Sequence, residues 1–198
     1  MLGLLPTSLT IHDKEYEINT DYRNILTIIS AFNDEELRDE EKMFICMARL
    51  FADFYSIPKA DYQEAYEKAV EFVECQMKSD KPSPKIVDWD KDEQLMFAAV
   101  NKVAGMEIRA ESYMHWWTFI GYFQNIDRDS LWGYILTIRQ KKAKGKKLDK
   151  AENEFYLANK SMIDVGRVTD RKLDAEMYAD ELFKALLEEQ REIEVKEG

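Results

Sequence analysis

The chain has 198 residues and a formal net charge of −11, and 45% of its residues are hydrophobic. The length suits one domain with a core plus a short extension, and the apolar content is too high for a disordered chain. The negative charge disfavours binding to nucleic acid or to an anionic membrane, so protein partners are favoured. Seven Gly and four Pro are too few for a strand-rich fold, so a mainly α protein is predicted.

The first predicted element is a small β-hairpin over residues 8–19, because apolar and polar side chains alternate on both sides of Asp13-Lys14. Asn19 or Thr20 then caps the first helix. Apolar residues at helical spacing predict the helices that follow. In chain order the predicted helices cover about residues 20–32, 43–54, 61–78, 91–104, 129–142, 149–164 and 170–193, with the aromatic segment 111–124 before the fifth.

Breaks and caps set the limits of these helices. Pro58 ends the second helix pattern, since proline cannot donate a backbone hydrogen bond. Asp90, with Glu93 three residues later, fits a capping box that starts the fourth helix after the Pro-rich loop 81–84. Gly105 has the position expected of a left-handed residue just past the end of that helix.

The chain is expected to divide into two parts. Residues 1–165 are predicted to form a compact multi-helix domain with the N-terminal hairpin, and residues 166–198 an acidic amphipathic helical extension. This extension either packs on its own domain or docks in trans onto a partner or a second copy. Its apolar side is formed by Leu173, Met177, Tyr178, Leu182, Leu186 and Ile193.

No span of about 20 apolar residues is present to cross a membrane, and MLGLLPTSLT does not resemble a signal peptide, so we expect an intracellular protein. Cys46 and Cys75 lie in helical patterns without a C-x-x-C spacing, and we expect both to be reduced core thiols.

A calcium site is considered at Asp88, Asp90 and Asp92, whose spacing matches the start of an EF-hand loop. The sixth and twelfth positions, which need glycine and glutamate, are Glu93 and Ala99 instead. We therefore expect these acids to favour a helix N-terminus and to bind no metal.

Catalytic motifs are also missing. His12 and His115 are the only histidines, and neither has the spacing of a zinc site. His115, beside Trp116 and Trp117, is either a general base in an aromatic pocket or, the favoured alternative, a residue that caps a helix or packs at the edge of the core. Without a Walker loop, a Rossmann glycine pattern or a G-x-S-x-G motif, no catalytic residue and no cofactor are predicted.

A basic stretch stands out on this acidic chain. It either contacts phosphate or, as favoured here, forms a solvated loop or binds an acidic protein segment, for which the C-terminal helix is a candidate. Its cations are Arg139, Lys141, Lys142, Lys144, Lys146 and Lys147.

Several segments taken together resemble a family of tailed-bacteriophage proteins known as phage gene product fifteen, found in phages and prophages of Gram-positive bacteria. The resemblance covers about residues 8–163, and HWWTF is its most specific element. The matching segments are EYEINTDYR, DEELRDEEKMF, DWDKDEQLMFAAV, and SYMHWWTF followed by GYI.

This resemblance implies a non-enzymatic viral protein encoded between the major tail protein and the tape-measure protein, similar in position to tail assembly chaperones. The implied partners are the tape-measure protein and the tail-tube protein, in the cytoplasm of the bacterial host. The alternative is a structural component retained in the tail or connector, and self-association is also open. Candidate partner-binding residues are His115, Trp116, Trp117, Phe119, Met177, Leu182 and Leu186.

Overall fold

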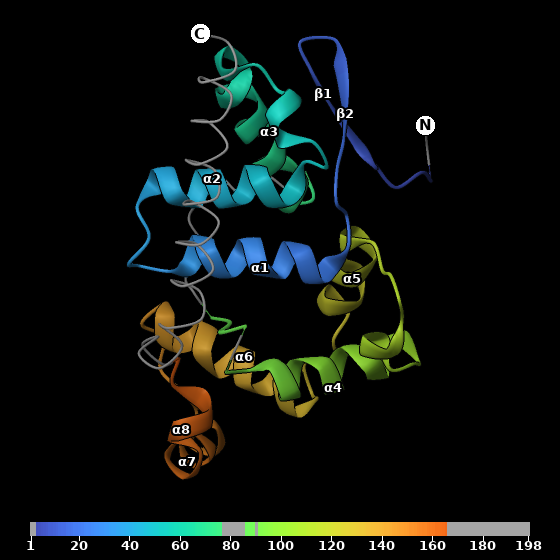
Figure 1. Cartoon of the computed structure of the whole chain (residues 1–198). Coiled ribbons are helices and arrows are strands. Elements are labelled where there is room, and N and C mark those ends of the chain that lie inside the picture. The colour runs from blue at the N-terminus through green and yellow to red at the C-terminus, as the bar shows by residue number, and fades with distance from the viewer. Residues whose placement is uncertain (1–2, 77–85, 90, 166–198) are drawn as a thin grey trace, which may run out of the picture. The chain divides into compact units, whose positions relative to one another are not determined.

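The computed structural model describes residues 3–76, 86–89 and 91–165, and it confirms a mainly α fold with a small N-terminal β-hairpin (Figure 1). The chain divides after Val165, and the predicted C-terminal helix lies outside the described residues. The helices are α1 (Tyr22–Asn33), α2 (Asp39–Leu50), α3 (Tyr62–Val73), α4 (Glu93–Ala104), α5 (Trp116–Gln124), α6 (Leu131–Ala143), α7 (Lys150–Ala158) and α8 (Lys160–Ile163), with short 3₁₀ turns at Phe54–Ser56, Lys59–Asp61 and Ile108–Ala110.

The hairpin consists of the antiparallel strands β1 (Ser8–Ile11) and β2 (Lys14–Glu17). Its turn is His12-Asp13, one residue earlier than predicted. Both residues have positive φ, 43° and 65°, as a two-residue hairpin turn that follows the twist of the strands requires. The register places Leu9 opposite Tyr16.

Two predicted boundaries near the hairpin were wrong. Asp21, and not Asn19 or Thr20, caps α1 by accepting a hydrogen bond from the Arg23 backbone N–H. Helix α2 ends at Leu50 and does not continue to Phe54, because Phe51 turns extended and forms a bridge with Ile18 after β2. Strand pairing thus competes successfully with the helical pattern.

The boundaries around the Pro-rich loop also differ from the prediction. Helix α3 ends at Val73, and Cys75 and Gln76 follow with positive φ; residues 77–85 lie outside the described residues. The predicted capping box was wrong, since Glu93 is the first residue of α4 and not its third. Gly105, at φ 71°, is confirmed as the left-handed residue that ends α4.

The last predicted helix of the domain, 149–164, is two helices. Asn159 separates α7 from α8, and its backbone N–H donates to the carbonyl oxygens of Phe155 and Tyr156. Asp149 and Glu152 form a capping box at the start of α7. The short α8 brings Ile163 into the core.

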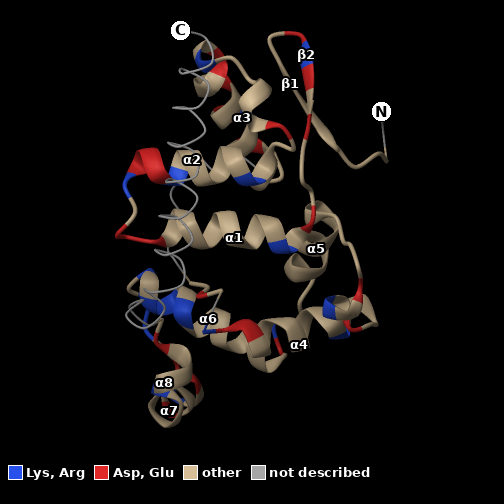
Figure 2. Cartoon of the chain, in the orientation of Figure 1, with Lys and Arg blue, Asp and Glu red and all other residues tan. Residues whose placement is uncertain are grey.

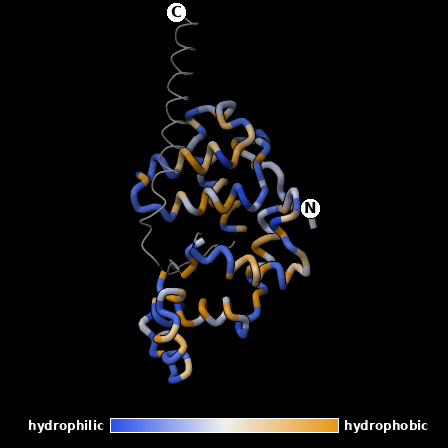
Figure 3. Tube along the Cα trace, turned by 60° about the horizontal axis from the view of Figure 1, so that its bottom comes forward, coloured by the Kyte–Doolittle hydropathy of each residue, from blue (hydrophilic) through white to orange (hydrophobic). Residues whose placement is uncertain are grey.

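Helix α5 lies between two groups of elements (Figure 1): the hairpin with α1–α3, and α4 with α6–α8. The rings of Tyr22 on α1 and Phe119 on α5 stack with centroids 4.7 Å apart, and Phe97 on α4 packs edge-on against Tyr22. Helices α1, α4 and α5 therefore share one aromatic core. In the hydropathy view, short apolar and polar segments alternate along the described part of the chain (Figure 3).

Both cysteines are free, as predicted; Cys46 is buried and Cys75 half-buried. Burial raises the pKa of Cys46 to about 12 and that of Cys75 to about 11. Within the described residues no helix is both long and apolar enough to span a membrane.

Candidate functional site

His115 is the N-cap of α5. Its Nδ1 accepts a hydrogen bond from the Trp117 backbone N–H at 3.0 Å, and its Nε2 lies 2.9 Å from the carbonyl oxygen of Pro6. A carbonyl only accepts, so Nε2 carries the proton and both ring nitrogens are engaged. The side chain is buried. This confirms the capping interpretation, and neither nitrogen is left to act as a base.

The tryptophans next to His115 attach α5 to the end of α3. Trp116 Nε1 donates to the Val73 carbonyl at 2.8 Å, and Trp117 Nε1 donates to the Phe72 carbonyl at 3.1 Å. Trp116 and Phe119 are buried, and Trp117 is partly exposed.

The candidate partner-binding residues therefore fall into two groups. Three of the four aromatic-segment candidates belong to the interior, and Trp117 alone among them reaches the surface. The other three, Met177, Leu182 and Leu186, lie outside the described residues. A role in partner binding stays a prediction for both groups.

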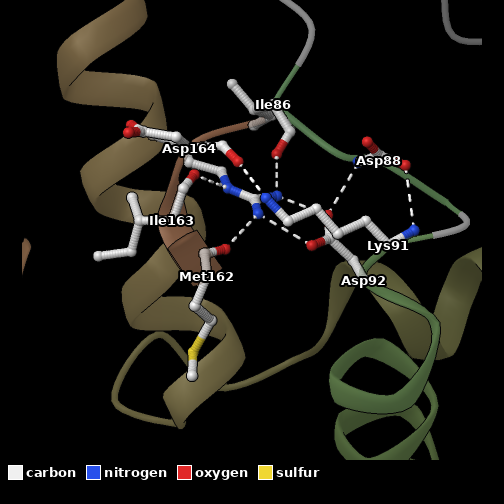
Figure 4. Close-up of polar contacts among 8 residues, drawn as sticks. Ile86, Asp88, Lys91, Asp92, Met162, Ile163 and Asp164 are labelled. Atoms are coloured by element: carbon white, nitrogen blue, oxygen red, sulfur yellow. Dashed lines mark hydrogen bonds and ion pairs between the residues drawn. The ribbon is translucent and has the colours of Figure 1, made fainter. Parts of the chain in front are cut away.

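The predicted basic stretch contains one buried cation. Arg139 forms a bidentate ion pair with Asp92, and the two side chains are 3% and 1% exposed. The guanidinium also donates to the carbonyl oxygens of Ile86, Met162 and Ile163 (Figure 4). This Arg139 cluster joins α6 to the segment before α4 and to the end of α8.

The other cations of the stretch have different surroundings. Lys141 forms an ion pair with Glu152, and Lys142 pairs with Asp164 at 2.6 Å. Lys144, Lys146 and Lys147 are exposed and follow α6, whose blue end in Figure 2 is formed by the cations before them. We did not predict from the sequence that Arg139 is buried, because nothing in the sequence distinguishes it from the lysines that follow.

Two of the three acids that suggested a calcium loop, Asp88 and Asp92, have structural roles. Asp92 accepts from Arg139 and also from the Asp88 backbone N–H at 2.8 Å. Asp88 accepts from the Lys91 backbone N–H, and Asp90 lies outside the described residues. Across the part of the chain that the structure describes, no group of three or more His, Cys, Asp and Glu side chains is arranged to hold a metal ion.

A groove of about 450 Å³ lies between α1 and α4, and we call it the α1–α4 groove. Apolar and aromatic side chains form much of its lining, while two arginines, Glu93 and small hydroxyl residues complete it. The lining residues are Tyr22, Arg23, Leu26, Thr27, Ser30, Trp89, Glu93, Met96, Phe97 and Arg109.

Aromatic rings and arginines meet at one end of the α1–α4 groove. The Arg23 guanidinium lies 4.6 Å from the Tyr22 ring centroid, and that of Arg109 lies 5.2 Å from the Phe97 ring centroid. Arg23 pairs with Asp21, and Arg109 pairs with Glu107. Both cations thus have carboxylate partners and lie over rings that are only 1% and 6% exposed, so the groove offers a small, mostly apolar surface with a neutralised rim.

The hydroxyl and carboxyl groups near this end have shifted pKa values. Burial raises the pKa of Tyr22, which stays a neutral phenol. Hydrogen bonds from Arg109 and Asn101 lower the pKa of Glu107 to about 2, so that this carboxylate is ionised. The sequence carried no signal for the groove, because it depends on two helices separated by some 60 residues of chain.

The family model described as Bacteriophage Gp15 protein matches residues 1–165. The chain belongs to this family. No curated protein and no solved structure matches the chain.

Membership of the Bacteriophage Gp15 protein family confirms the resemblance found in the sequence and makes the chain a phage protein. The matched region ends at Val165, where the chain divides, and it contains both the Arg139 cluster and the α1–α4 groove.

Proposed function

We propose that this Gp15 family protein is a non-enzymatic phage tail assembly chaperone, which binds the tape-measure protein, the tail-tube subunits or both in the cytoplasm of the bacterial host. The observation that carries the proposal is the α1–α4 groove, an apolar surface on a phage protein. A tape-measure protein is a long helical chain whose apolar stripes need cover until tube subunits enclose it.

The groove is short. Its lining runs from Tyr22 to Ser30 on α1 and from Glu93 to Phe97 on α4, so the two walls extend over ~12 Å and ~6 Å, which suits one or two turns of a helical partner. An amphipathic helix binds such a groove through residues spaced three and four apart. Leu26 and Trp89 are partly exposed, and they are the apolar side chains that such a helix can contact in the groove.

The chemistry of the described residues supports a binding role over catalysis. Both nitrogens of His115 are engaged by backbone groups. The raised pKa values of Cys46 and Cys75 keep both thiols protonated at neutral pH, and a protonated thiol is a poor nucleophile.

Co-expression with the tape-measure protein tests the proposal. The wild-type chain is expected to keep that protein soluble and to co-purify with it. Leu26→Glu, which places a charge in the groove, should reduce the yield of the complex at least ~10-fold, because a carboxylate buried against an apolar helix is costly. The matched control is Leu157→Glu, at an exposed leucine on α7 far along the chain from the groove.

Failure of the wild-type chain to bind any tail protein would end the chaperone proposal. If Leu26→Glu and Leu157→Glu give equal yields of the complex, the groove is not the binding site.

Mass spectrometry of purified virions separates the chaperone from a retained structural component, because only the latter appears in particles at fixed copy number. Deleting residues 167–198 in the same co-expression assay tests the predicted docking of the C-terminal helix in trans.

A further inference from the structure

The turn between α6 and α7 is strongly basic. Residues 141–150 contain six lysines and a single acid, on a chain whose net charge is −11. Four of these lysines are exposed, and none of the four forms an ion pair with a described residue. We call them the lysine turn, and they are Lys144, Lys146, Lys147 and Lys150.

The carboxylates closest to the lysine turn are engaged elsewhere. Asp149 accepts from the Glu152 backbone N–H at 2.9 Å as the cap of α7, and Glu152 pairs with Lys141. Asp164 pairs with Lys142 at 2.6 Å. Because none of these three acids forms an ion pair with the lysine turn, its positive charge stays uncompensated on an acidic protein.

Two helix caps fix the backbone of this turn. Gly145, at φ 64°, ends α6 in a Schellman motif, and its N–H donates to the Lys142 carbonyl at 3.0 Å. The capping box that begins at Asp149 opens α7. Leu148, between the two caps, packs against the core. The lysines thus project from an ordered backbone, so that binding needs to order only their side chains.

Helix dipoles account for only part of this charge. Lys144 is the C-cap of α6, where the negative end of the helix dipole favours a cation. Lys146 and Lys147 lie beyond that helix, and Lys150 is the first residue of α7, where the positive end of the dipole disfavours a cation. Positions that break a local preference are expected at functional sites. The stability of the two helices therefore does not explain the lysine turn.

We propose that the lysine turn binds an acidic segment of another protein. Carboxylates three and four residues apart on a helical segment lie ~5–6 Å from one another, and each flexible lysine side chain can reach one of them. Such charge complementarity selects the partner and speeds association more than it adds affinity. The lining of the α1–α4 groove ends in sequence at Arg109, so this second surface goes beyond the proposed function and does not rest on it.

The composition of the lysine turn favours a protein over a nucleic acid. It contains no arginine and no aromatic residue, the side chains that give nucleic-acid sites their bidentate contacts and base stacking. Duplex DNA also carries phosphates on either side of any contact, and these meet the acidic remainder of the chain. A short acidic segment confines its charge to the turn.

Fluorescence anisotropy with a labelled peptide of about 20 glutamates tests the proposal on the full chain at low salt, where ion pairs are least screened. The wild-type chain is expected to bind the peptide. Lys146→Glu with Lys147→Glu should raise the dissociation constant at least ~5-fold, because two attractions become repulsions. The matched control, Lys59→Glu with Lys102→Glu, reverses two other exposed lysines and should change the constant less than ~2-fold.

Two results overturn the proposal directly. One is a wild-type chain that does not bind the peptide, and the other is an equal effect of the two double variants, which would reduce binding to net charge. Duplex DNA of about 20 base pairs is the second probe. If it binds more tightly than the peptide and the Lys146→Glu, Lys147→Glu variant weakens it, the lysine turn recognises phosphate and the proposal is wrong.

The last test concerns the acidic sequence 166–198, which lies outside the described residues. Glu188→Gln with Glu189→Gln in the full chain should leave the dissociation constant of the peptide unchanged. If these substitutions tighten binding ~5-fold, the end of the chain itself competes for the lysine turn, and a separate protein is not its occupant.

Discussion

Arg139 shows how one buried charge organises this domain. An ion pair taken out of water is tolerated only when its remaining hydrogen-bonding groups also have partners. Arg139 meets this condition, because its guanidinium binds Asp92 and three backbone carbonyl oxygens. Lys91 reinforces the same junction by donating to the Asp164 carbonyl.

Breaking this pair should be costly. Arg139→Met is expected to lower the free energy of unfolding by ~3–5 kcal/mol, because it leaves the Asp92 carboxylate buried without its counter-ion. Urea denaturation at neutral pH measures the change. Lys144→Met, at an exposed position five residues further along, is the control and should change stability by less than ~0.5 kcal/mol.

The double variant Arg139→Met with Asp92→Leu separates burial from pairing. It should be less destabilised than the sum of the two single variants, since it leaves no unpaired charge. If the losses of unfolding free energy in the two single variants simply add up in the double variant, the broken ion pair is not the source of the destabilisation.

At the scale of single elements, the start of α6 depends on a close approach that only glycine allows. A Cβ atom on Gly133 would lie 2.2 Å from the Asp127 carbonyl oxygen and 2.8 Å from Arg128 Cα, both backbone atoms. The turn that brings them there also places Ser130, whose hydroxyl caps α6 by accepting from the Gly133 N–H.

Gly133→Ala and Gly121→Ala should therefore have opposite effects. The first is expected to destabilise the chain by ~1–3 kcal/mol or more, because the 127–130 turn must move to admit the methyl group. The second lies within α5 with no atom near its added Cβ, and should stabilise the chain by ~0.5–1 kcal/mol through helix propensity. Thermal or urea unfolding checks both. Two changes of the same sign would contradict the steric account.

At the scale of single elements, the sequence predicted those features of the fold that depend on local chemistry. The hairpin, the order of helices and the end of α4 at Gly105 follow from alternation, helical spacing and the left-handed preference of glycine. The end of α2 was wrong because Phe51 finds a distant strand partner, Ile18. Such pairing is decided by tertiary structure, which no local pattern records.

The whole molecule explains why the candidate site was harder to predict than the fold. The α1–α4 groove exists because α1 and α4 both pack against α5. Tyr22 of α1 and Phe97 of α4 each contact Phe119 of α5, and they also contact one another. The aromatic segment that identified the family was predicted to face either the core or a partner, and the structure places Trp116 and Phe119 in the core. The aromatic segment is therefore specific to the family more directly because its side chains pack in the core than because they bind a partner.

The end of the domain gives the last prediction. A chain that ends after Val165 keeps the contacts of Met162, Ile163 and Asp164 with the Arg139 cluster and Lys142. A chain that ends after Asn159 loses two carbonyl acceptors of a buried guanidinium and the buried Ile163 side chain.

The shorter chain should be less stable than the longer by at least ~3 kcal/mol, from lost charge-assisted hydrogen bonds and a lost core side chain. Tryptophan fluorescence during urea unfolding measures this difference directly, because all four tryptophans precede Asn159 and are present in both chains. Equal unfolding midpoints would show that α8 is dispensable, and that Arg139 and Asp92 hold the segment before α4 without help from the end of the domain.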